Sequence, residues 1–185
     1  MRIIAGEFRG RSIKAVKGDH TRPTTDKIKE NMFNMLGQFF DGGCALDLYA
    51  GSGNLGIEAI SRGIDEAIFI DKHPDAIRTI HDNVKALRIE EKVQIYRNDA
   101  FKALAVLAKK DIQFDLIFLD PPYKNQKINE VLAIIAENGL LVDDGLVVCE
   151  YLVEDSTDMN FDEFGVTRQE NYGITEIAIL KNRKK

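Results

Sequence analysis

Short apolar runs alternate with segments of helical periodicity along most of the chain. The apolar runs lie at residues 45–48, 67–70, 93–96, 116–119 and 146–151. The run at residues 116–119 has no polar alternation, which is typical of a strand that is buried on both faces of a parallel sheet. Before and between these runs, apolar residues recur at helical spacing over residues 27–40, 74–87, 101–109 and 131–135. This order predicts an α/β fold in which right-handed crossovers join the strands of a mostly parallel sheet.

Capping and turn residues indicate where several of these elements should begin or end. Thr24 or Thr25 can cap the first helix, and Gly42-Gly43 is expected to end it. Pro74 suits the first turn of the helix that it opens. Asp143-Asp144-Gly145 is typical of a turn before the last parallel strand.

The alternation of strands and helices breaks at both ends of the chain. Residues 2–16 resemble a small basic hairpin, which is not stable alone and must pack on something. At the other end, residues 164–169 and 175–180 predict an antiparallel hairpin, so the last strand of the sheet should be reversed. We expect a hairpin extension over residues 1–20 and a single core over residues 21–185.

Composition limits the class of protein. The chain has 185 residues, of which 44% are hydrophobic and 30% charged, as in ordinary globular proteins. It contains no run near the ~20 apolar residues that a membrane span needs, and its first residues lack the apolar region of a signal peptide. We therefore expect a cytoplasmic protein with no membrane contact. Cys44 and Cys149 are expected to be buried hydrophobes, and the three histidines form no ligand pattern, so no metal is predicted.

The net charge of −5 conceals a basic N-terminal segment. Residues 1–40 hold eight Lys/Arg and four Asp/Glu, whereas the rest of the chain is acidic. Such a segment can dock on phosphates, although a solvated charged face or a decorated sheet edge explains it about equally well. The candidate RNA contacts are Arg2, Arg9, Arg11, Lys14 and Arg22.

The run at residues 116–119 ends in Asp120-Pro121-Pro122-Tyr123. Two prolines fix successive φ angles and leave their carbonyls free as acceptors. Asp120 adds a carboxylate acceptor, and Tyr123 offers a flat face on which a base can stack. This corner suits a planar amine or amide, such as the exocyclic amine of a nucleobase. A strand end closed by two prolines, with a tyrosine that packs, explains the same residues about as well.

A glycine loop joins the strand at residues 45–48 to a helix. Gly51, Gly53 and Gly56 allow a tight turn and a close approach of the backbone to a ligand. Asp71 follows Gly51 by twenty positions and ends the next strand, where a carboxylate that binds ribose belongs. Asp99 follows the third strand and can either accept from an adenine amine or cap the helix after it.

These strand ends should meet at one edge of the sheet, where open α/β sheets bind their ligands. Two cofactors compete for that edge. Asp47 precedes the glycines and can meet the ammonium of S-adenosylmethionine, whereas it would oppose the pyrophosphate of a dinucleotide. The chain also lacks a clear hydride-handling Lys-Tyr pair or catalytic histidine. A methyltransferase is therefore favoured over an NAD-dependent oxidoreductase.

The motifs together resemble those of the RsmD-type 16S ribosomal RNA guanine-N2 methyltransferases, over almost the whole chain. They are Arg22-Pro23-Thr24-Thr25-Asp26, Leu46-Asp47-Leu48-Tyr49-Ala50-Gly51-Ser52-Gly53, Asn98-Asp99-Ala100 and Asp120-Pro121-Pro122-Tyr123. The glycine and Asp-Pro-Pro-Tyr motifs occur in many amino-methylating enzymes, and the N-terminal segment narrows the resemblance to this family. Tyr49 stands where Phe is more usual, a minor departure.

The resemblance implies a Rossmann-like class I methyltransferase with a seven-stranded sheet and one antiparallel strand. Its cofactor would be S-adenosylmethionine. The implied cofactor contacts are Asp47, Tyr49, Ala50, Gly51 and Gly53 for the methionine, Asp71 and Lys72 for the ribose, and Asp99 and Ala100 for the adenine. Asp120, the Pro121 carbonyl and Tyr123 would hold the target guanine.

The implied reaction is methyl transfer to N2 of one guanine in 16S ribosomal RNA, within a small-subunit assembly intermediate and by a monomer. An adenine-N6 DNA methyltransferase is the main alternative, although a chain this short has no insert to read DNA sequence. A protein-glutamine methyltransferase would favour Asn in place of Asp120. An NAD-dependent oxidoreductase and a non-catalytic RNA-binding module remain as alternatives of other classes.

Overall fold

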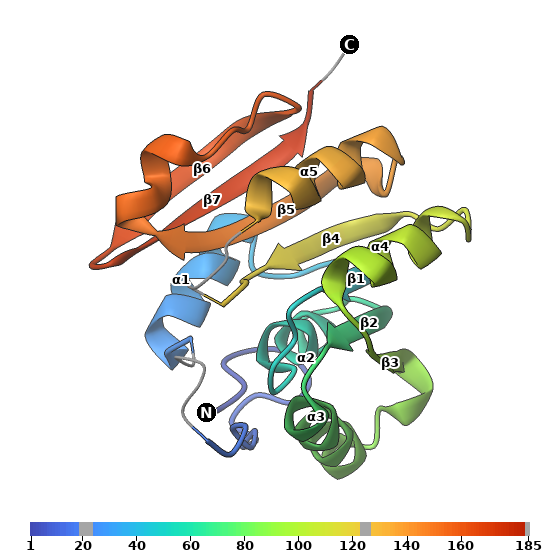
Figure 1. Cartoon of the computed structure of the whole chain (residues 1–185). Coiled ribbons are helices and arrows are strands. Elements are labelled where there is room, and N and C mark those ends of the chain that lie inside the picture. The colour runs from blue at the N-terminus through green and yellow to red at the C-terminus, as the bar shows by residue number, and fades with distance from the viewer. Residues whose placement is uncertain (19–23, 123–126, 184–185) are drawn as a thin grey trace.

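The computed structural model describes residues 1–18, 24–122 and 127–183. Across these residues one sheet contains seven strands in the order β3-β2-β1-β4-β5-β7-β6 (Figure 1). The strands are β1 (Cys44–Asp47), β2 (Glu66–Asp71), β3 (Val93–Arg97), β4 (Phe114–Leu119), β5 (Leu141–Leu152), β6 (Phe164–Tyr172) and β7 (Thr175–Asn182). Strands β1 to β5 pair in parallel, and β7 is antiparallel to both β5 and β6. The predicted sheet with one reversed strand is confirmed.

Helices cover both faces of the sheet. They are α1 (Asp26–Leu36), α2 (Asn54–Ser61), α3 (Pro74–Leu87), α4 (Ala100–Ala108) and α5 (Ile128–Glu137), with 3₁₀ turns at Glu90–Lys92 and Val153–Asp158. Helices α1 to α3 pack on one face, and α4 and α5 on the other (Figure 1). Side chains alternate between the faces, so Phe118 and Val148 meet the first group of helices, whereas Leu119 and Cys149 meet the second.

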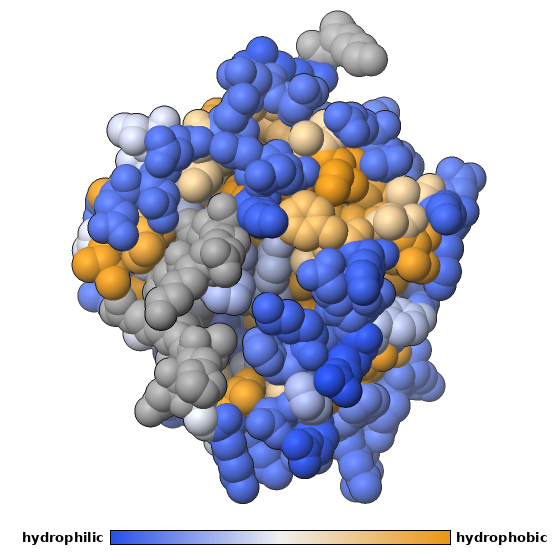
Figure 2. Space-filling model, in the orientation of Figure 1, coloured by the Kyte–Doolittle hydropathy of each residue, from blue (hydrophilic) through white to orange (hydrophobic). Residues whose placement is uncertain are grey.

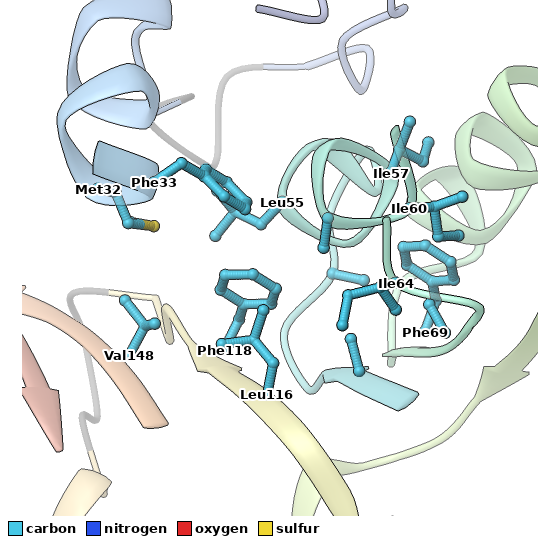
Figure 3. Packing of buried hydrophobic residues seen from close by; sticks show 14 of the residues in the cluster. Met32, Phe33, Leu55, Ile57, Ile60, Ile64, Phe69, Leu116, Phe118 and Val148 are labelled. Carbon is cyan, nitrogen blue, oxygen red and sulfur yellow. The ribbon is translucent and has the colours of Figure 1, made fainter. Parts of the chain in front are cut away.

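Aromatic packing joins α1 to the sheet. Phe33 faces Phe118 of β4 with ring centroids 5.8 Å apart, and Leu55 and Met32 lie beside the pair (Figure 3). At the surface, hydrophobic residues gather over α4 and α5 in an otherwise largely hydrophilic view (Figure 2). Because the buried face of α1 is anchored to β4, Thr24 just before the helix is held beside the carboxyl end of this strand.

Helix α1 ends earlier than its apolar pattern predicts. Gly37 takes a left-handed φ of 106°, and its N–H donates to the Phe33 carbonyl, which closes the helix at Leu36. The prediction that Gly42-Gly43 ends this helix is wrong, because Gly37 is the first glycine able to adopt that conformation. Phe39 lies beyond the helix and is largely exposed.

The expected turn at Asp143-Asp144-Gly145 is also wrong. Strand β5 runs through these residues, and the pairing of β4 with β5 shifts register between Phe114 and Leu116. Such an irregularity accommodates extra residues inside a strand without ending it. The turn-forming residues therefore produce a bulge near the amino end of β5 and leave its carboxyl end regular.

The backbone of residues 2–16 forms fewer paired residues than a regular β-hairpin would. A single antiparallel bridge joins Arg2 to Ser12, flanked by Ile3 N–H donating to the Arg11 carbonyl at 2.9 Å. Ile3 and Ile13 are buried in the same cluster as α1 to α3, so the segment packs directly on the sheet's helical layer. The regular strands expected within residues 2–16 do not form.

A buried ionic cluster fixes this segment in place. Glu58 of α2 pairs with Lys29 of α1 at 3.1 Å and with Arg62 at 2.9 Å, and it accepts the N–H groups of Ile4 and Ala5. Burial lowers the pKa of Lys29, while Glu58 opposes that shift. Each charge has hydrogen-bonded partners, which offset the cost of removing it from water. The cluster thereby joins the N-terminal segment, α1 and α2.

Thr25 should contribute measurably to stability as the N-cap of α1. Its Oγ1 accepts from the Ile28 N–H at 3.2 Å. We expect Thr25→Ala to lower the free energy of unfolding by about 1 kcal/mol, because an N–H of the first turn loses its partner. Thr25→Ser keeps the hydroxyl and is the control. Urea denaturation with an unchanged slope would measure the loss, and equal midpoints for both variants would contradict the capping role.

Candidate active site

Three acidic side chains lie on one face of the sheet at the carboxyl ends of adjacent strands. Asp47 ends β1, Asp120 follows β4, and Glu150 lies near the end of β5. Leu119 pairs with Cys149, so the next residues along both strands, Asp120 and Glu150, are neighbours. The alternation of side chains directs all three acids toward the layer of α1 to α3.

Asp47 is almost fully buried beneath the glycine loop. Its Oδ2 accepts the N–H of Gly56 at 3.0 Å. Burial raises the pKa of Asp47 to about 7, the Gly56 hydrogen bond opposes the shift, and the charge of Asp71 adds to it. Burial and the charge of Asp71 both disfavour the ionised carboxylate, and a bound ammonium group would relieve that cost.

The glycine loop takes the conformation that the sequence predicts. Gly51 and Gly53 have φ angles of 57° and 83°, which favour glycine. A Cβ added at Gly51 would meet no atom within 4 Å, so the loop backbone is open on that side. Asp71 supports the loop directly, because its Oδ2 accepts the Gly51 N–H at 2.9 Å while Oδ1 accepts the His73 N–H.

Asn54 begins α2 immediately after this loop. Its Oδ1 accepts from Lys29 Nζ at 2.8 Å, which orients the side-chain amide. The side chain is buried, and its Nδ2 has no hydrogen-bond partner among the described residues. An unpartnered buried donor next to an open glycine loop suits an anionic ligand group such as a carboxylate. Sequence reasoning missed this residue.

The residues predicted for the adenine lie around the start of α4. Asp99 is the N-cap of that helix, and its Oδ1 accepts from the N–H groups of Phe101 and Lys102. Ala100 is the first helical residue. Burial, followed by the charge of Asp99, raises the pKa of the half-buried Tyr49 to about 12. The capping role is therefore observed, and the adenine contact stays a prediction.

Two further residues of the predicted cofactor site, Ala50 and Lys72, lie near Asp71. The Ala50 N–H donates to the Ile70 carbonyl at 2.9 Å, which holds the loop against β2. Lys72 is exposed, and its carbonyl accepts from Arg97 Nε at 3.2 Å. The structure thus gathers the loop and the ends of β2 and β3 at one edge.

Asp120 lies in a polar corner beside Thr24, two residues before α1. Thr24 Oγ1 is 3.5 Å from Asp120 Oδ2 and 3.4 Å from Glu150 Oε2. Burial raises the pKa of Asp120 well above its usual value, the charges of Glu150 and Asp47 raise it further, and Thr24 opposes the shift. Pro121 is buried. Tyr123 lies outside the described residues.

The predicted RNA contacts lie at two ends of the N-terminal segment. The Arg2 N–H donates to Asp26 at the start of α1, and the backbone of Lys14 bonds Asn83, whose Nδ2 also donates to the Ser52 carbonyl in the glycine loop. Arg2 and Lys14 are therefore near the site.

The other basic residues lie farther away or are not described. Arg11 donates to the Ala86 carbonyl at the end of α3, and Arg9 lies in the loop that packs by Ser61 at the end of α2. In a parallel α/β sheet the carboxyl ends of helices such as α2 and α3 lie at the amino ends of the strands, at the edge opposite the candidate site. Arg22 lies outside the described residues.

Glu150 is the main residue that sequence reasoning missed. It lies inside the apolar run of residues 146–151, which predicted a strand there and gave no sign of a functional acid. Within residues 1–18, 24–122 and 127–183, no group of three His, Cys, Asp or Glu is placed to hold a metal ion. Nor does this part of the chain contain a helix long and apolar enough to cross a membrane. Cys44 and Cys149 are free thiols, half-buried and buried respectively.

Comparisons with known proteins agree with the motifs. The family described as "Conserved hypothetical protein 95" matches residues 1–181. YlbH from Bacillus subtilis is 50% identical over 99% of this chain and all of its own. Ribosomal RNA small subunit methyltransferase D from Escherichia coli is 32% identical over 83% of this chain and 76% of its own. The solved structure of yhhF from Escherichia coli has a TM-score of 0.84 at 28% identity, over all of this chain and 99% of that chain. This chain therefore belongs to the conserved hypothetical protein 95 family, the family of the ribosomal RNA small subunit methyltransferase D proteins that its motifs resemble.

Proposed function

We propose that the protein transfers a methyl group from S-adenosylmethionine to the exocyclic N2 of one guanine in 16S ribosomal RNA. The observation that carries the proposal is the Asp120 carboxyl, held beside Thr24 in the same edge of the sheet as the open glycine loop. A carboxyl oxygen that could accept a proton, at the same edge as a loop suited to the cofactor, supports the proposal. Family membership then supports ribosomal RNA of the small subunit as the substrate class.

The described residues fit S-adenosylmethionine. Asp47 offers a buried carboxylate for the ammonium, and Asn54 Nδ2 offers a donor for the carboxylate of the methionine moiety. Asp71 has two oxygens that each accept one backbone N–H and retain capacity for a ribose hydroxyl. Asp99 and Ala100 begin α4 on the adenine side. When bound, the cofactor supplies an electrophilic methyl group.

Asp120 would activate the amine of the target base. The lone pair of guanine N2 is delocalised into the ring, so the free base is a weak nucleophile. A hydrogen bond from the amine to Asp120, and a second to the Pro121 carbonyl, would favour a more pyramidal nitrogen. Its raised pKa makes Asp120 a stronger proton acceptor near neutral pH than an exposed aspartate.

The RNA must present an unstacked base to this edge, as for other enzymes that modify bases. Tyr123 would stack on the base, and Arg2 and Lys14 lie where they can contact nearby phosphates. We infer that a small-subunit assembly intermediate is the physiological substrate and that a monomer acts on it. A ribosomal substrate implies a cytoplasmic protein.

Transfer of radiolabelled methyl groups tests the proposal. Naked 16S RNA, small subunits that lack the modification, duplex DNA and a protein extract would be offered in parallel. Label in RNA or subunits, recovered as N2-methylguanine, is expected. Label only in DNA as N6-methyladenine, or only in protein, would overturn the substrate while leaving a methyltransferase. Binding of NADH in place of S-adenosylmethionine would overturn the cofactor.

A further inference from the structure

Glu150 is a buried acid for which the proposed reaction has as yet no role. It is 4% exposed and lies near the carboxyl end of β5. The strand register makes it the neighbour of Asp120, and Thr24 Oγ1 lies within 3.5 Å of a carboxyl oxygen of each acid. The hydroxyl thus stands between two carboxyl groups at the centre of the site.

The hydrogen-bonding capacity of Thr24 limits the states of this trio. A threonine hydroxyl has one proton to donate and two lone pairs that accept. If both acids are ionised, Thr24 can donate to only one of them. If one acid carries a proton, it can donate to Thr24, which then donates to the other acid. A single shared proton therefore completes an unbroken chain from either carboxyl group to the other.

We propose that Glu150 acts through Asp120 as a positioning residue, and that the proton which Asp120 removes from the substrate amine passes through the Thr24 hydroxyl to Glu150. This inference rests on the proposed amine methylation and assigns two further residues to it. Thr24 and Glu150 would set the orientation and basicity of Asp120 without touching the substrate.

The step balances in atoms and charge. The lone pair of the amine nitrogen forms the new N–C bond as the S–C bond of the cofactor breaks, and the bonding electrons stay on sulfur. The nitrogen then loses a proton to the Asp120 carboxylate. Asp120 passes a proton to Thr24 Oγ1 as Thr24 passes its own to the Glu150 carboxylate. One positive charge leaves the sulfonium and one arrives as a proton on the acid pair, so the net charge of the site is unchanged.

The electrostatics of the site support this assignment. The charged groups that face Asp120 from neighbouring strands are Glu150 of β5 and Asp47 of β1, and both raise its pKa, whereas the hydrogen bond from Thr24 lowers it. Glu150 therefore makes Asp120 a stronger base, and Thr24 limits that effect. Removal of the Glu150 charge and removal of the Thr24 hydroxyl should therefore shift the pKa of Asp120 in opposite directions.

Two variants test the opposed shifts through the dependence of the single-turnover rate on pH. Glu150→Gln removes a negative neighbour, so the rise of the rate with pH should move to lower pH and the plateau should fall by about tenfold or more, because Asp120 becomes a weaker base. Thr24→Val removes the hydroxyl at nearly constant volume, so the rise should move to higher pH. Thr24→Ser should restore most of the wild-type profile.

A second readout does not depend on activity. Carboxyl ¹³C resonances of labelled aspartate in the protein without cofactor should report the pKa of Asp120, assigned by comparison with Asp120→Asn. This pKa should fall in Glu150→Gln and rise in Thr24→Val. A merely structural role would lower rates in both variants without moving the titrations in opposite directions. If Glu150→Gln fails to fold, Thr24→Val and Thr24→Ser still test the proton path, because a rate, a pH profile and an Asp120 titration that Thr24→Val leaves unchanged would overturn it.

Failure of this inference is distinct from failure of the proposed function. If the wild-type protein methylates no RNA, the proposed substrate is wrong. The titration of Asp120 in the variants then still tests the role of Glu150. Wild-type protein that methylates guanine, with Glu150→Gln matching it in rate, pH profile and Asp120 titration, would overturn the role of Glu150 alone. Glu137→Gln, at the exposed end of α5 and away from this edge, is the matched control and should behave as wild type.

Discussion

Replacement of Asp120 by alanine is expected to lower methyl transfer by about 10³-fold while S-adenosylmethionine still binds. The carboxyl group is proposed both to orient the substrate amine and to accept its proton, and alanine does neither. Its neighbours Thr24 and Glu150 would remain in place, so the fold should persist. Single-turnover rates and calorimetric titration with S-adenosylmethionine measure the two effects separately.

Asp120→Asn divides the two roles of that carboxyl group. Asparagine keeps an oxygen that accepts a hydrogen bond from the amine, but it cannot take up a proton near neutral pH. If proton acceptance matters, Asp120→Asn should lose nearly as much activity as Asp120→Ala. Asp143→Ala, an exposed residue at the other end of β5, is the control. Normal turnover by Asp120→Ala would refute the assignment of the active site.

The α/β order of this chain is predictable because it depends on local periodicity. Apolar runs such as residues 116–119 reveal strands without reference to distant residues, and glycines after a buried strand identify the ligand loop. The end of α1 was not predictable in this way, since Gly37 and Gly42-Gly43 both match a stop signal. Only the observed left-handed conformation at Gly37 decides between them.

Single residues of the site could be predicted from the strand that each one follows or ends. The contacts between these residues depend on how the strands pair, which local patterns do not show. Asp71 and Asp120 each follow an apolar run, and Asp47 precedes the glycine loop, so a local pattern indicates each of them separately. That Glu150 neighbours Asp120 follows from the register of β4 with β5, which no local pattern contains. The role of Asp71 as a support of the glycine loop likewise requires the distance to the Gly51 N–H.

Asp47→Asn should separate stability from function. The carboxyl group is buried, its pKa is raised from 3.8 to about 7, and asparagine can keep the hydrogen bond from Gly56. At pH 7.5 the wild type without cofactor holds a buried negative charge that the variant lacks. We therefore expect Asp47→Asn to raise the free energy of unfolding by about 2 kcal/mol at pH 7.5, because a buried negative charge is removed from the interior.

The sign of the pH dependence follows from the raised pKa. Between about pH 4 and pH 7 the native wild type binds more protons at Asp47 than the unfolded chain does, so this group lowers stability as the pH rises through that window. Below pH 4 both states are protonated and the penalty disappears. The stability difference between Asp47→Asn and wild type should therefore shrink steadily as the pH falls from 7.5 to 4, as urea denaturation at several pH values would measure.

The same substitution should weaken cofactor binding, because the ammonium of S-adenosylmethionine loses its anionic partner. We expect the dissociation constant of Asp47→Asn at pH 7.5 to rise about 100-fold, the loss associated with a buried charge-assisted hydrogen bond. For the wild type, affinity should fall as the pH drops below about 7, where Asp47 takes up a proton. Calorimetric titration of both proteins at pH 7.5 and pH 6 would measure these changes. A variant that is less stable than wild type yet binds the cofactor equally well would show that Asp47 serves the fold and does not bind the ammonium.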